Sequence, residues 1–419
     1  MRITEVTVTP IAIKDPPLRN VKGIHQPYAL RAVLEVATDE GLVGLGETFF
    51  GAQAVEAYVH ETAAPYLLSK DPLQIERHAT ALRGYLGSAS TGVELRGNSA
   101  IDIALWDLLG QVSGQPLYQL LGGASRDSIP IYNTCAGYRY VRERPVQTVE
   151  NWGLGKGEPD GPYEDLEAFL TDAGRLAEDL LAQGITGMKI WPFDPYAEAS
   201  NGTWISEHDL DSGLKPFRKI RGAVGSAMDI MVEFHSLWDV PTAQRILRAL
   251  EEFEPYWYED PVRPDSPSAL SQVARSTRVR VAAGETLAGR RAFRELLDRE
   301  AAQVVIVDPS WCGGISEARK IGTLAEAYGI PVTPHDCTGP VVLTASTHLS
   351  IHLPNAPVQE TVRAYYTGWY RELVTALPTI EKGRIRPPEG AGLGTSLLPH
   401  VRERADAHVR SSTLEHAPV

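Results

Sequence analysis

The sequence is short of the features that direct a chain to an oxidising compartment or a membrane. It holds three cysteines among 419 residues, Cys135, Cys312 and Cys337, too few and too scattered for a disulfide framework. It has no run of about 18 apolar residues of the kind that spans a bilayer. Its start, MRITEVTVTPIAI, lacks the basic stretch and continuous apolar run of a signal peptide. These absences predict a cytoplasmic location and no membrane partner.

Positive charge is also scarce. The chain carries 40 Lys and Arg against 53 Asp and Glu, a net charge of −13, and its basic residues form no cluster. Nucleic acid binding needs a basic patch, so nucleic acid is excluded as a partner. A small anionic substrate stays compatible, because the local charge of a metal site can outweigh the global balance.

The motifs of two common cofactors are missing as well. The segment GLVGLGET has glycines at 44 and 46, but Phe49 stands where the third glycine of a dinucleotide motif belongs. No HExxH or CxxC motif offers a zinc site.

What the sequence does have is a recurrence. Six acidic or histidine residues, each ending a short apolar run, are separated by 26, 26, 23, 27 and 25 positions: Glu233, Glu259, Glu285, Asp308, His335 and Glu360. A strand, a helix and two loops repeat at about this length in a (β/α)₈ barrel, and barrel enzymes carry their chemistry at the C-terminal strand ends. The spacing therefore predicts that all six side chains project into one mouth.

The rest of the chain completes an α/β architecture. We predict an N-terminal α+β capping domain over 1–125, a (β/α)₇β TIM-like barrel over 128–385, and a C-terminal segment, 386–419, that returns to the cap. Two polar inserts rich in Gly and Pro, 143–165 and 192–213, follow predicted barrel strands and are expected to wall or cover the mouth.

Glu233, Glu259 and Glu285 end three consecutive predicted strands, so their carboxylates converge. Unpaired, they would repel one another and be partly protonated. A hard divalent cation resolves this conflict, and an all-oxygen ligand set suits Mg²⁺ or Mn²⁺ better than Zn²⁺. Each glutamate alone could be a solvated strand end or an ion-pair partner, but three in register favour a metal site.

Two histidines are expected on opposite sides of this site. Asp308 and His335 end neighbouring strands, and a carboxylate beside an imidazole fixes its tautomer and raises its basicity. His235 follows Glu233 by two positions, so strand alternation points both side chains the same way. Predicted strands three and seven face each other across the barrel, an arrangement suited to proton removal on one face of a ligand and proton donation on the other.

These residues, with the helix AIDIALWDLLG and the motifs WYEDP, AAGE, VDPSWCGGI, TPH and VQE, resemble the enolase superfamily in its mandelate racemase subgroup. The resemblance covers essentially the whole chain. VEFHSLW, AAGETLAGRRAF and PHDCTGP are most similar to the D-galactonate dehydratase type.

The resemblance implies a Mg²⁺-dependent dehydratase of acid sugars, aldonates or aldarates, with one ion per subunit and Mn²⁺ as a substitute. It implies that Glu233, Glu259 and Glu285 hold the ion, which binds the substrate carboxylate. His335, oriented by Asp308, would remove the C2 proton, with Glu360 hydrogen-bonding nearby. His235 would protonate the departing C3 hydroxyl, giving a 2-keto-3-deoxy acid. Members of the family commonly assemble as homo-oligomers.

Two positions depart from the subgroup's pattern. Its racemases carry Lys-x-Lys on the second strand. Here the segment KIW has Lys189 at the first of these positions and Trp191 at the second, which weakens the interpretation as a racemase or a lactonising enzyme. Lys189 is expected either to touch the substrate carboxylate or to pair with a glutamate, and Trp191 either to wall the pocket or to lie in the core. Glu233 stands where the family usually has Asp, which puts substrate identity in doubt more than metal binding.

Substrate selection in this superfamily is assigned to N-terminal loops, which here match 15–29. Arg19, Lys22 and His25 are expected either to meet substrate hydroxyls or a distal carboxylate, or to belong to a solvated loop. Two alternatives to the dehydratase stay open. Histidines on both faces could also racemise or epimerise a 2-hydroxy acid. A barrel that has kept only metal binding and has lost catalysis is the third.

Overall fold

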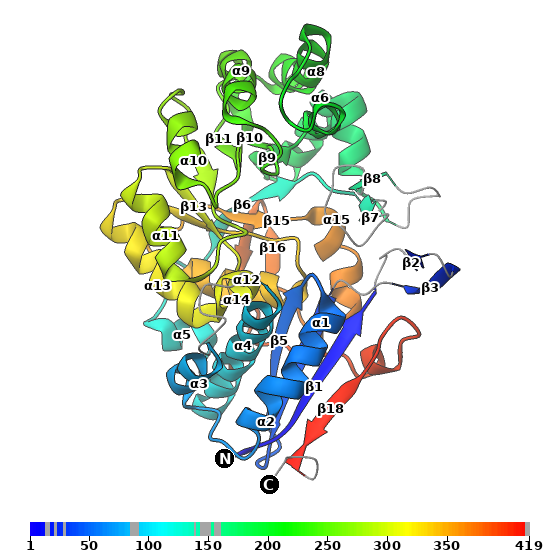
Figure 1. Cartoon of the computed structure of the whole chain (residues 1–419), viewed down its shortest axis with the longest axis vertical. Coiled ribbons are helices and arrows are strands. Elements are labelled where there is room, and N and C mark those ends of the chain that lie inside the picture. The colour runs from blue at the N-terminus through cyan, green and yellow to red at the C-terminus, as the bar shows by residue number, and fades with distance from the viewer. Residues whose placement is uncertain are drawn as a thin grey trace.

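The molecule consists of an α+β cap joined to a larger barrel (Figure 1). The computed structural model describes residues 1–12, 17–20, 23–27, 31–83, 92–137, 140–142, 152–154 and 161–414. Four short strands are described by their backbone alone: β2 (Pro17–Asn20), β3 (Gly23–Pro27), β7 (Tyr140–Arg142) and β8 (Trp152–Leu154). β2 pairs with β3 and β7 with β8, both antiparallel.

The cap is an antiparallel sheet with helices packed on it. Its strands lie in the order β18 (Arg410–Thr413), β1 (Ile3–Ile11), β4 (Arg31–Thr38) and β5 (Val43–Phe49). Its helical segments are α1 (Ala52–Tyr58), a π-helical stretch (Val59–Ala63), α2 (Ala64–Leu67), α3 (Ile75–Leu82), α4 (Val93–Ser113) and α5 (Leu117–Leu121). The last strand of the chain pairs with the first, so both ends of the chain build the cap (Figure 1).

The glycines of GLVGLGET serve helix packing. A Cβ atom on Gly44 would lie 2.2 Å from the carbonyl oxygen of Ala104, and one on Gly46 would lie 2.0 Å from that of Ala100. Strand β5 can therefore approach α4 this closely only with glycine at both positions. This accounts for a glycine pattern that binds no dinucleotide.

Eight parallel strands form the barrel: β6 (Ile129–Thr134), β9 (Gly187–Ile190), β10 (Asp229–Glu233), β11 (Trp257–Glu259), β12 (Val281–Ala283), β13 (Val304–Val307), β14 (Val332–Pro334) and β15 (Gln359–Thr361). Consecutive strands pair from β6 to β14, and β15 pairs with β6 and contacts β14, which closes the ring. An antiparallel hairpin, β16 (Thr379–Glu381) and β17 (Arg384–Arg386), attaches to β6.

Seven helices follow the first seven strands and surround them: α6 (Asp165–Ala182), α8 (Glu207–Val224), α9 (Val240–Leu250), α10 (Pro267–Ala274), α11 (Gly289–Asp298), α13 (Gly314–Ala327) and α14 (Pro340–His352). Short helices α7 (Asp194–Ser200), α12 (Pro309–Cys312) and α15 (Arg363–Tyr366) lie in loops after β9, β13 and β15. 3₁₀ turns occupy Gly225–Ala227, Glu251–Phe253, Trp369–Glu372 and Pro399–Glu403.

Helix α9 shows how local sequence sets these elements. The carboxylate of Asp239 accepts a hydrogen bond from the backbone N–H of Thr242 at 2.9 Å, a standard N-cap. Ile246, Leu247 and Leu250 recur at helical spacing and are buried against the barrel.

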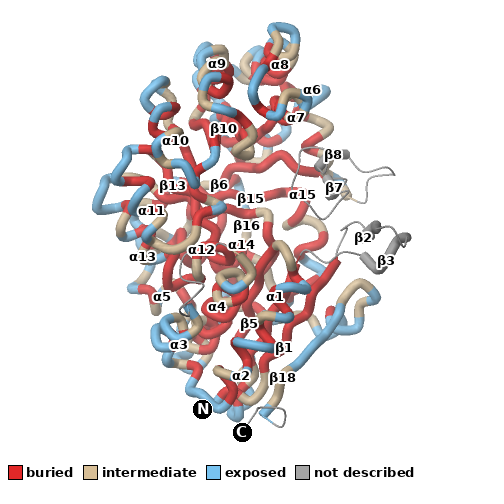
Figure 2. Tube along the Cα trace, viewed as in Figure 1, coloured by how far each residue is buried: buried red, intermediate tan, exposed pale blue. Residues whose placement is uncertain are grey.

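Burial follows the layers, since the barrel strands and inner helix faces are covered while the outer faces of α3, α8 and α11 reach solvent (Figure 2). The expected (β/α)₇β barrel with an α+β cap is confirmed; the boundaries at 125 and 385 stay predictions. No helix in the described ranges combines the length and apolar character needed to cross a bilayer.

Candidate active site

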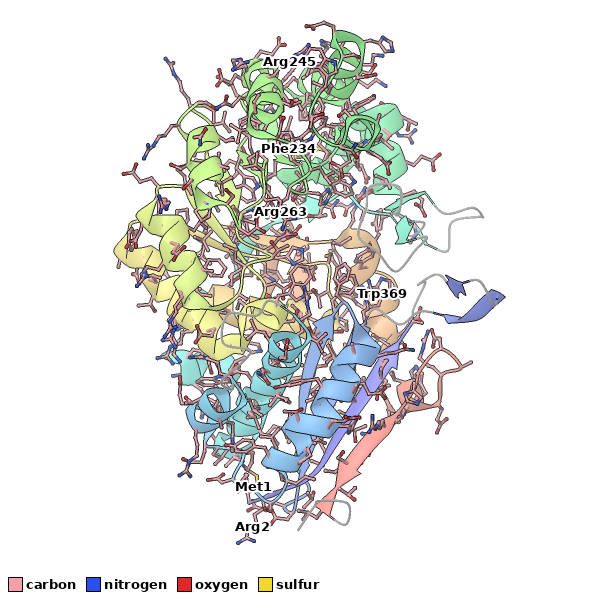
Figure 3. All side chains as sticks on the ribbon, in the orientation of Figure 1. Met1, Arg2, Phe234, Arg245, Arg263 and Trp369 are labelled. Carbon is pink, nitrogen blue, oxygen red and sulfur yellow. The ribbon has the colours of Figure 1, made fainter. Side chains whose placement is uncertain are left out.

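A cavity of about 650 Å³ lies at the C-terminal ends of the barrel strands, beneath the edge of the cap. Cap residues Phe49 and Phe50 contribute to its wall, and the barrel supplies glutamates, histidines and aromatic side chains. Figure 3 labels Phe234 and Arg263, which follow barrel strands β10 and β11, and Trp369 near the junction with the cap. Catalytic barrels keep their chemistry at this end of the strands.

The three predicted metal ligands come together there. Glu233 and Glu259 end neighbouring strands β10 and β11 and stand opposite each other in register. Glu285 follows β12 by two residues. One carboxylate oxygen from each lies within 4.8 Å of the other two. The periodicity of the sequence thus corresponds to a real convergence of side chains.

Lys189, on β9, is the cation that faces this cluster. Its Nζ lies 2.6 Å from Glu259, 2.8 Å from Glu360 and 3.3 Å from Glu233. Of the two expectations for Lys189, the structure displays the pairing with glutamates. One ammonium group faces several buried carboxylates, so negative charge remains in excess.

This excess of negative charge shifts the pKa values of the glutamates. Burial raises the pKa of Glu259 to about 8, with repulsion from Glu233 and Glu360 adding to the shift while Lys189 opposes it. Burial likewise raises the pKa of Glu285, against the attraction of His335 and Lys189. Both carboxylates therefore lack part of the positive charge that would stabilise their ionised forms.

A hard divalent cation fits this arrangement. The donor set consists of carboxylate oxygens from three adjacent strands, the ligand type that Mg²⁺ and Mn²⁺ prefer. Glu233 is already oriented, since its Oε1 accepts the backbone N–H groups of Phe234 at 3.0 Å and His235 at 2.7 Å. The extra methylene relative to aspartate does not remove Glu233 from the cluster.

His335 follows β14 and pairs with Asp308, which follows β13. Its Nδ1 lies 2.7 Å from the Oδ2 of Asp308. Asp308 is itself fixed, because it accepts the backbone N–H and the hydroxyl of Ser310 and the hydroxyl of Thr338. The indole of Trp311 packs on the imidazole with ring centroids 5.0 Å apart. His335 lines the cavity, and Nε2 forms the ring edge away from Asp308.

That edge meets a charged and a thiol group. Nε2 lies 3.6 Å from Glu285 and 3.3 Å from the Sγ of Cys337, a neighbour that the sequence pattern did not reveal. Burial opposes a charge on His335, but Cys337, Glu285 and Glu360, with the hydrogen bond to Asp308, raise its pKa above the ordinary value.

His235 stands on the other side of the cluster. It lines the cavity, but not by strand alternation: β10 ends at Glu233, and His235 has a left-handed backbone with φ of 47°. Its Nδ1 lies 2.6 Å from the Oδ2 of Asp194. Burial opposes its charge, yet the carboxylates of Asp194 and Glu233 raise the pKa of His235 to about 10.

Asp194 was not anticipated from the sequence. It opens the short helix α7 inside the 192–213 insert, so it belongs to no strand end and carries no periodic signal. The insert does border the cavity, through Asp194 and Pro195. The insert contains α7 and the start of α8. Helix α8 begins there because the hydroxyl of Ser206 accepts a hydrogen bond from the backbone N–H of Asp209.

Glu360, on β15, closes the charged cluster. It accepts hydrogen bonds from the hydroxyl of Thr134 and, at 3.0 Å, from the backbone N–H of Asp336, and it pairs with the ammonium of Lys189. These contacts lower its pKa, with Lys189 and His335 outweighing burial. Glu360 is therefore an ionised acceptor held close to His335.

Three predicted substrate-binding residues remain: Trp191, Arg19 and His25. Trp191 is 7% exposed and belongs to the buried core, and it also lines the cavity. Its ring meets that of His235 at a steep angle, with ring centroids 5.7 Å apart. Arg19 and His25 fall on β2 and β3, whose side chains lie outside the described residues. Their predicted contacts with substrate stay predictions.

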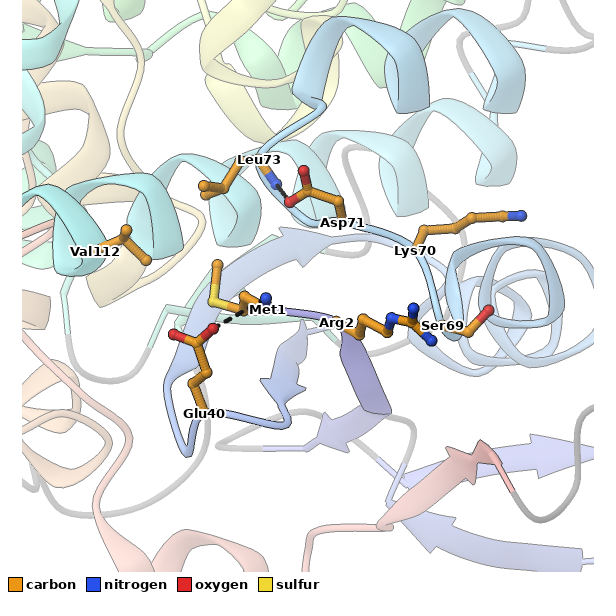
Figure 4. A pocket seen from close by; sticks show the side chains of 8 residues that line it. All are labelled: Met1, Arg2, Glu40, Ser69, Lys70, Asp71, Leu73 and Val112. Carbon is orange, nitrogen blue, oxygen red and sulfur yellow. Dashed lines mark hydrogen bonds and ion pairs between the residues drawn. The ribbon is translucent and has the colours of Figure 1, made fainter.

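A second, open hollow of about 610 Å³ lies at the edge of the cap and shares no residue with the cavity at the barrel mouth (Figure 4). The N-terminal ammonium of Met1 there pairs with Glu40 at 2.9 Å, and Asp71 accepts the backbone N–H of Leu73. These groups already satisfy one another, and the hollow adds no chemistry.

The whole-chain comparisons agree with this geometry. Residues 172–401 match the family model described as enolase C-terminal domain-like, and residues 3–122 match the mandelate racemase/muconate lactonizing enzyme N-terminal domain. The chain therefore belongs to the enolase superfamily, in its mandelate racemase subgroup.

Within that subgroup the chain is similar to D-galactonate dehydratases. One such protein, from Ralstonia nicotianae, is 31% identical over 397 residues, covering 92% of this chain and 94% of the relative. A D-xylonate dehydratase from Haloferax volcanii is 28% identical over 87% of this chain and 82% of its own. The crystal structure of an enolase of the mandelate racemase subgroup from Agrobacterium tumefaciens is 47% identical, with a TM-score of 0.84 and coverage of 99% of this chain and 100% of that one.

Proposed function

We propose that this enolase-superfamily enzyme is a Mg²⁺-dependent hydro-lyase that converts an aldonate or aldarate into a 2-keto-3-deoxy acid. The observation that carries the proposal is the cluster of Glu233, Glu259 and Glu285 with a carboxylate-bound histidine on either side. The dehydratase names of the relatives support the same class of reaction.

In this proposal His335 is the base. Asp308 holds its Nδ1–H, which leaves Nε2 to accept the proton from C2. The electron pair of that C–H bond first passes into the carboxylate as an enediolate, and in a second step it forms the C2–C3 double bond as the C3–O bond breaks. His235 gives its Nε2 proton to the departing oxygen, which leaves as water. The resulting enol takes up a proton at C3, loses its hydroxyl proton and becomes the 2-keto-3-deoxy acid.

The other charged groups prepare this step. A divalent cation held by Glu233, Glu259 and Glu285 supplies, when bound, the positive charge that a substrate carboxylate needs as its C2 proton leaves. Lys189 lies within the same cluster and adds a second positive charge. Glu360, fixed by Thr134 and Asp336, is an acceptor beside the reacting centre.

A screen of C4–C6 aldonates and aldarates with added Mg²⁺ tests the function. The expected result is a 2-keto-3-deoxy acid, detected with semicarbazide, from at least one acid. A C2 epimer without such a product would instead establish the racemase or epimerase alternative. Absence of both products, and of deuterium incorporation at C2, across the library would favour a barrel without catalysis.

Two variants assign the histidines. His335→Asn should abolish both C2 exchange and dehydration, because no base remains. His235→Asn should block dehydration and leave C2 exchange with D₂O in place. Full turnover by either variant would refute the assigned roles.

The setting of the enzyme is also a proposal. The three cysteines are free thiols, which suits a reducing compartment, and we place the chain in the cytoplasm. A homo-oligomer stays a prediction that light scattering on the purified protein can decide.

A further inference from the structure

A second carboxylate–imidazole pair stands at the mouth, and its carboxylate is Asp194. The Oδ2 of Asp194 lies 2.6 Å from the Nδ1 of His235, as close as Asp308 lies to His335. Each imidazole also has a tryptophan packed on it, Trp191 or Trp311. The two histidines, which come from different strands and opposite sides of the cluster, are thus held by the same kind of device.

The contact between Asp194 and His235 is supported by the packing of the residues that precede them. Phe193 and Phe234, the residues that precede them, are fully buried and stack with ring centroids 6.1 Å apart and an interplanar angle of 11°. The backbone of the two segments is therefore fixed one residue before each functional side chain.

The far end of α7 is fixed to the same loop. The carbonyl oxygen of Gly202 accepts the backbone N–H of Asp239 at 3.0 Å. A Cβ on Gly202 would lie 1.8 Å from the carbonyl oxygen of Leu237, so only glycine allows the approach. Helix α7 is thus attached at its start to Phe234 and His235 and, just past its end, to Leu237 and Asp239, so Asp194 cannot move away without breaking that packing.

The hydrogen bond sets what His235 can do. A carboxylate on Nδ1 favours the ring form with a proton on Nδ1 and leaves Nε2 for the cavity. Nε2 has no hydrogen-bond partner among the residues that the structure describes. A proton carried on Nε2 faces the cavity, and the hydrogen bond between Nδ1 and Asp194 keeps the ring oriented for its transfer.

We propose that Asp194 is the positioning residue of His235, so that each of the two histidines works as half of an Asp–His pair. This inference rests on the proposed function for the acid role of His235. It goes beyond that function in assigning to the insert after β9 a part in the chemistry as well as in walling the mouth. The proton that leaves His235 comes from Nε2, and the hydrogen bond between Nδ1 and Asp194 stays in place.

The test compares Asp194→Asn and Asp194→Ala with Asp239→Asn. The control also changes an aspartate that begins a helix beside the same loop, but Asn is an equally good N-cap and Asp239 binds Gly202 through its backbone. With Mg²⁺ and an accepted acid in D₂O, both Asp194 variants should lower dehydration about 100-fold and leave C2 exchange within about threefold of the wild type. Asp239→Asn should change neither rate.

A second readout needs no turnover. In the Mg²⁺-loaded protein with ¹⁵N-labelled histidine, the ring nitrogens of His235, identified by the loss of their signals in His235→Asn, should report a proton on Nδ1. Asp194→Ala should shift them toward the other tautomer, and Asp239→Asn should not. This readout decides the pairing even if no sugar acid is dehydrated, so failure of the proposed function and failure of this inference are distinguishable.

Three results would overturn the inference. Asp194→Ala could dehydrate at the wild-type rate, exchange and dehydration could fall together by the same factor, or the Nδ1 signal of His235 could be unchanged in Asp194→Ala. The second result would mean that Asp194 only maintains the fold of the mouth.

Discussion

Two clusters of buried charge lie back to back across strands β6 and β15, and they differ in how their charge is balanced. The glutamate cluster, on the inner side, consists of Glu233, Glu259, Glu285, Glu360 and Lys189. The arginine cluster, on the outer side, consists of Arg363, Asp165, Asp179 and Asn133. Strand alternation separates them, since Thr134 bonds to Glu360 whereas the adjacent Asn133 bonds to Asp165.

In the arginine cluster each charged side chain is held by an ion pair or hydrogen bonds. Arg363 makes two hydrogen bonds of 2.7 Å to the carboxylate of Asp165 and one of 2.5 Å to Asp179. Its backbone N–H donates to Asn133, whose amide donates to Asp165. The ring of Tyr163 lies 4.1 Å from the guanidinium. The cluster is satisfied without any ligand and joins the first and last barrel strands to α6.

In the glutamate cluster four carboxylates face one ammonium group, and burial raises the pKa of Glu259 to about 8. Such a cluster costs stability unless a cation occupies it. Both clusters bury charge, but only in the arginine cluster is each charged group matched by partners within the protein. We infer that this matching, rather than burial itself, separates a structural cluster from a functional one. The predictions below test that distinction.

The largest effect is expected for Glu259→Gln. The amide removes one ligand charge, so dehydration should fall by about 10⁴-fold or more, as expected when electrostatic stabilisation of the developing charge is lost. The metal-free protein should lose less than about 1 kcal/mol of unfolding free energy, because repulsion within the cluster is relieved. Steady-state kinetics and urea unfolding in EDTA measure the two quantities. Near-normal activity with strongly reduced stability would reverse the comparison.

Arg363→Met should show the opposite pattern. Removing the guanidinium leaves Asp165 buried without its counter-charge, which should lower the free energy of unfolding by about 3–5 kcal/mol. Turnover per folded molecule should stay within a few-fold of the wild type. Asp179→Asn is the matched control, since the side chain of Asp179 is 52% exposed and should contribute less than about 1 kcal/mol. Equal losses in the two variants would argue against the buried pair.

His348 extends the comparison to a buried group that is kept neutral. Its Nδ1 accepts the backbone N–H of Tyr118 at 3.3 Å and its Nε2 donates to the carbonyl of Leu393 at 3.2 Å. Burial lowers its pKa to about 4, against 6.5 for an ordinary histidine. The unfolded chain therefore takes up the proton first, and stability is fully present above about pH 6.5 and declines as the pH falls toward 4.

That shift corresponds to about 3 kcal/mol, measurable by urea unfolding between pH 7 and pH 4.5. His348→Gln, whose amide can both accept and donate, should lose much less stability over the same range. Identical pH profiles for the two proteins would remove His348 from the explanation.

The smallest effect is expected for Glu233→Asp, which installs the residue usual in the family. The shorter side chain withdraws its oxygens from the backbone N–H groups of Phe234 and His235. We expect divalent cation affinity to weaken about tenfold, equivalent to about 1.4 kcal/mol. Titration calorimetry measures it, and complete loss of binding would show that the longer residue is indispensable.

The sequence predicted the inner cluster and missed the outer one for a physical reason. Side chains at the C-terminal ends of parallel strands must meet, so the recurrence from Glu233 to Glu360 was enough to place them in one mouth. Nothing in that argument locates Arg363, which bonds to α6 from a short helix after β15.

Asp194 and His235 show the same limit at the mouth itself. Asp194 begins a helix inside an insert, where no period applies, and its approach to His235 depends on the stacking of Phe193 on Phe234. His235 was placed correctly in the cavity although its backbone leaves the strand geometry from which its direction was argued. Contacts between loops depend on side-chain packing, which the spacing of strand ends does not predict.

Binding of Mn²⁺, followed by electron paramagnetic resonance of the free ion, tests most directly whether the unbalanced cluster is a cation site. We predict one Mn²⁺ per chain that Mg²⁺ displaces, loss of that binding in Glu259→Gln, and full retention in Asp179→Asn. A wild-type protein that binds no Mn²⁺, or a Glu259→Gln variant that binds it as tightly as the wild type, would contradict the account.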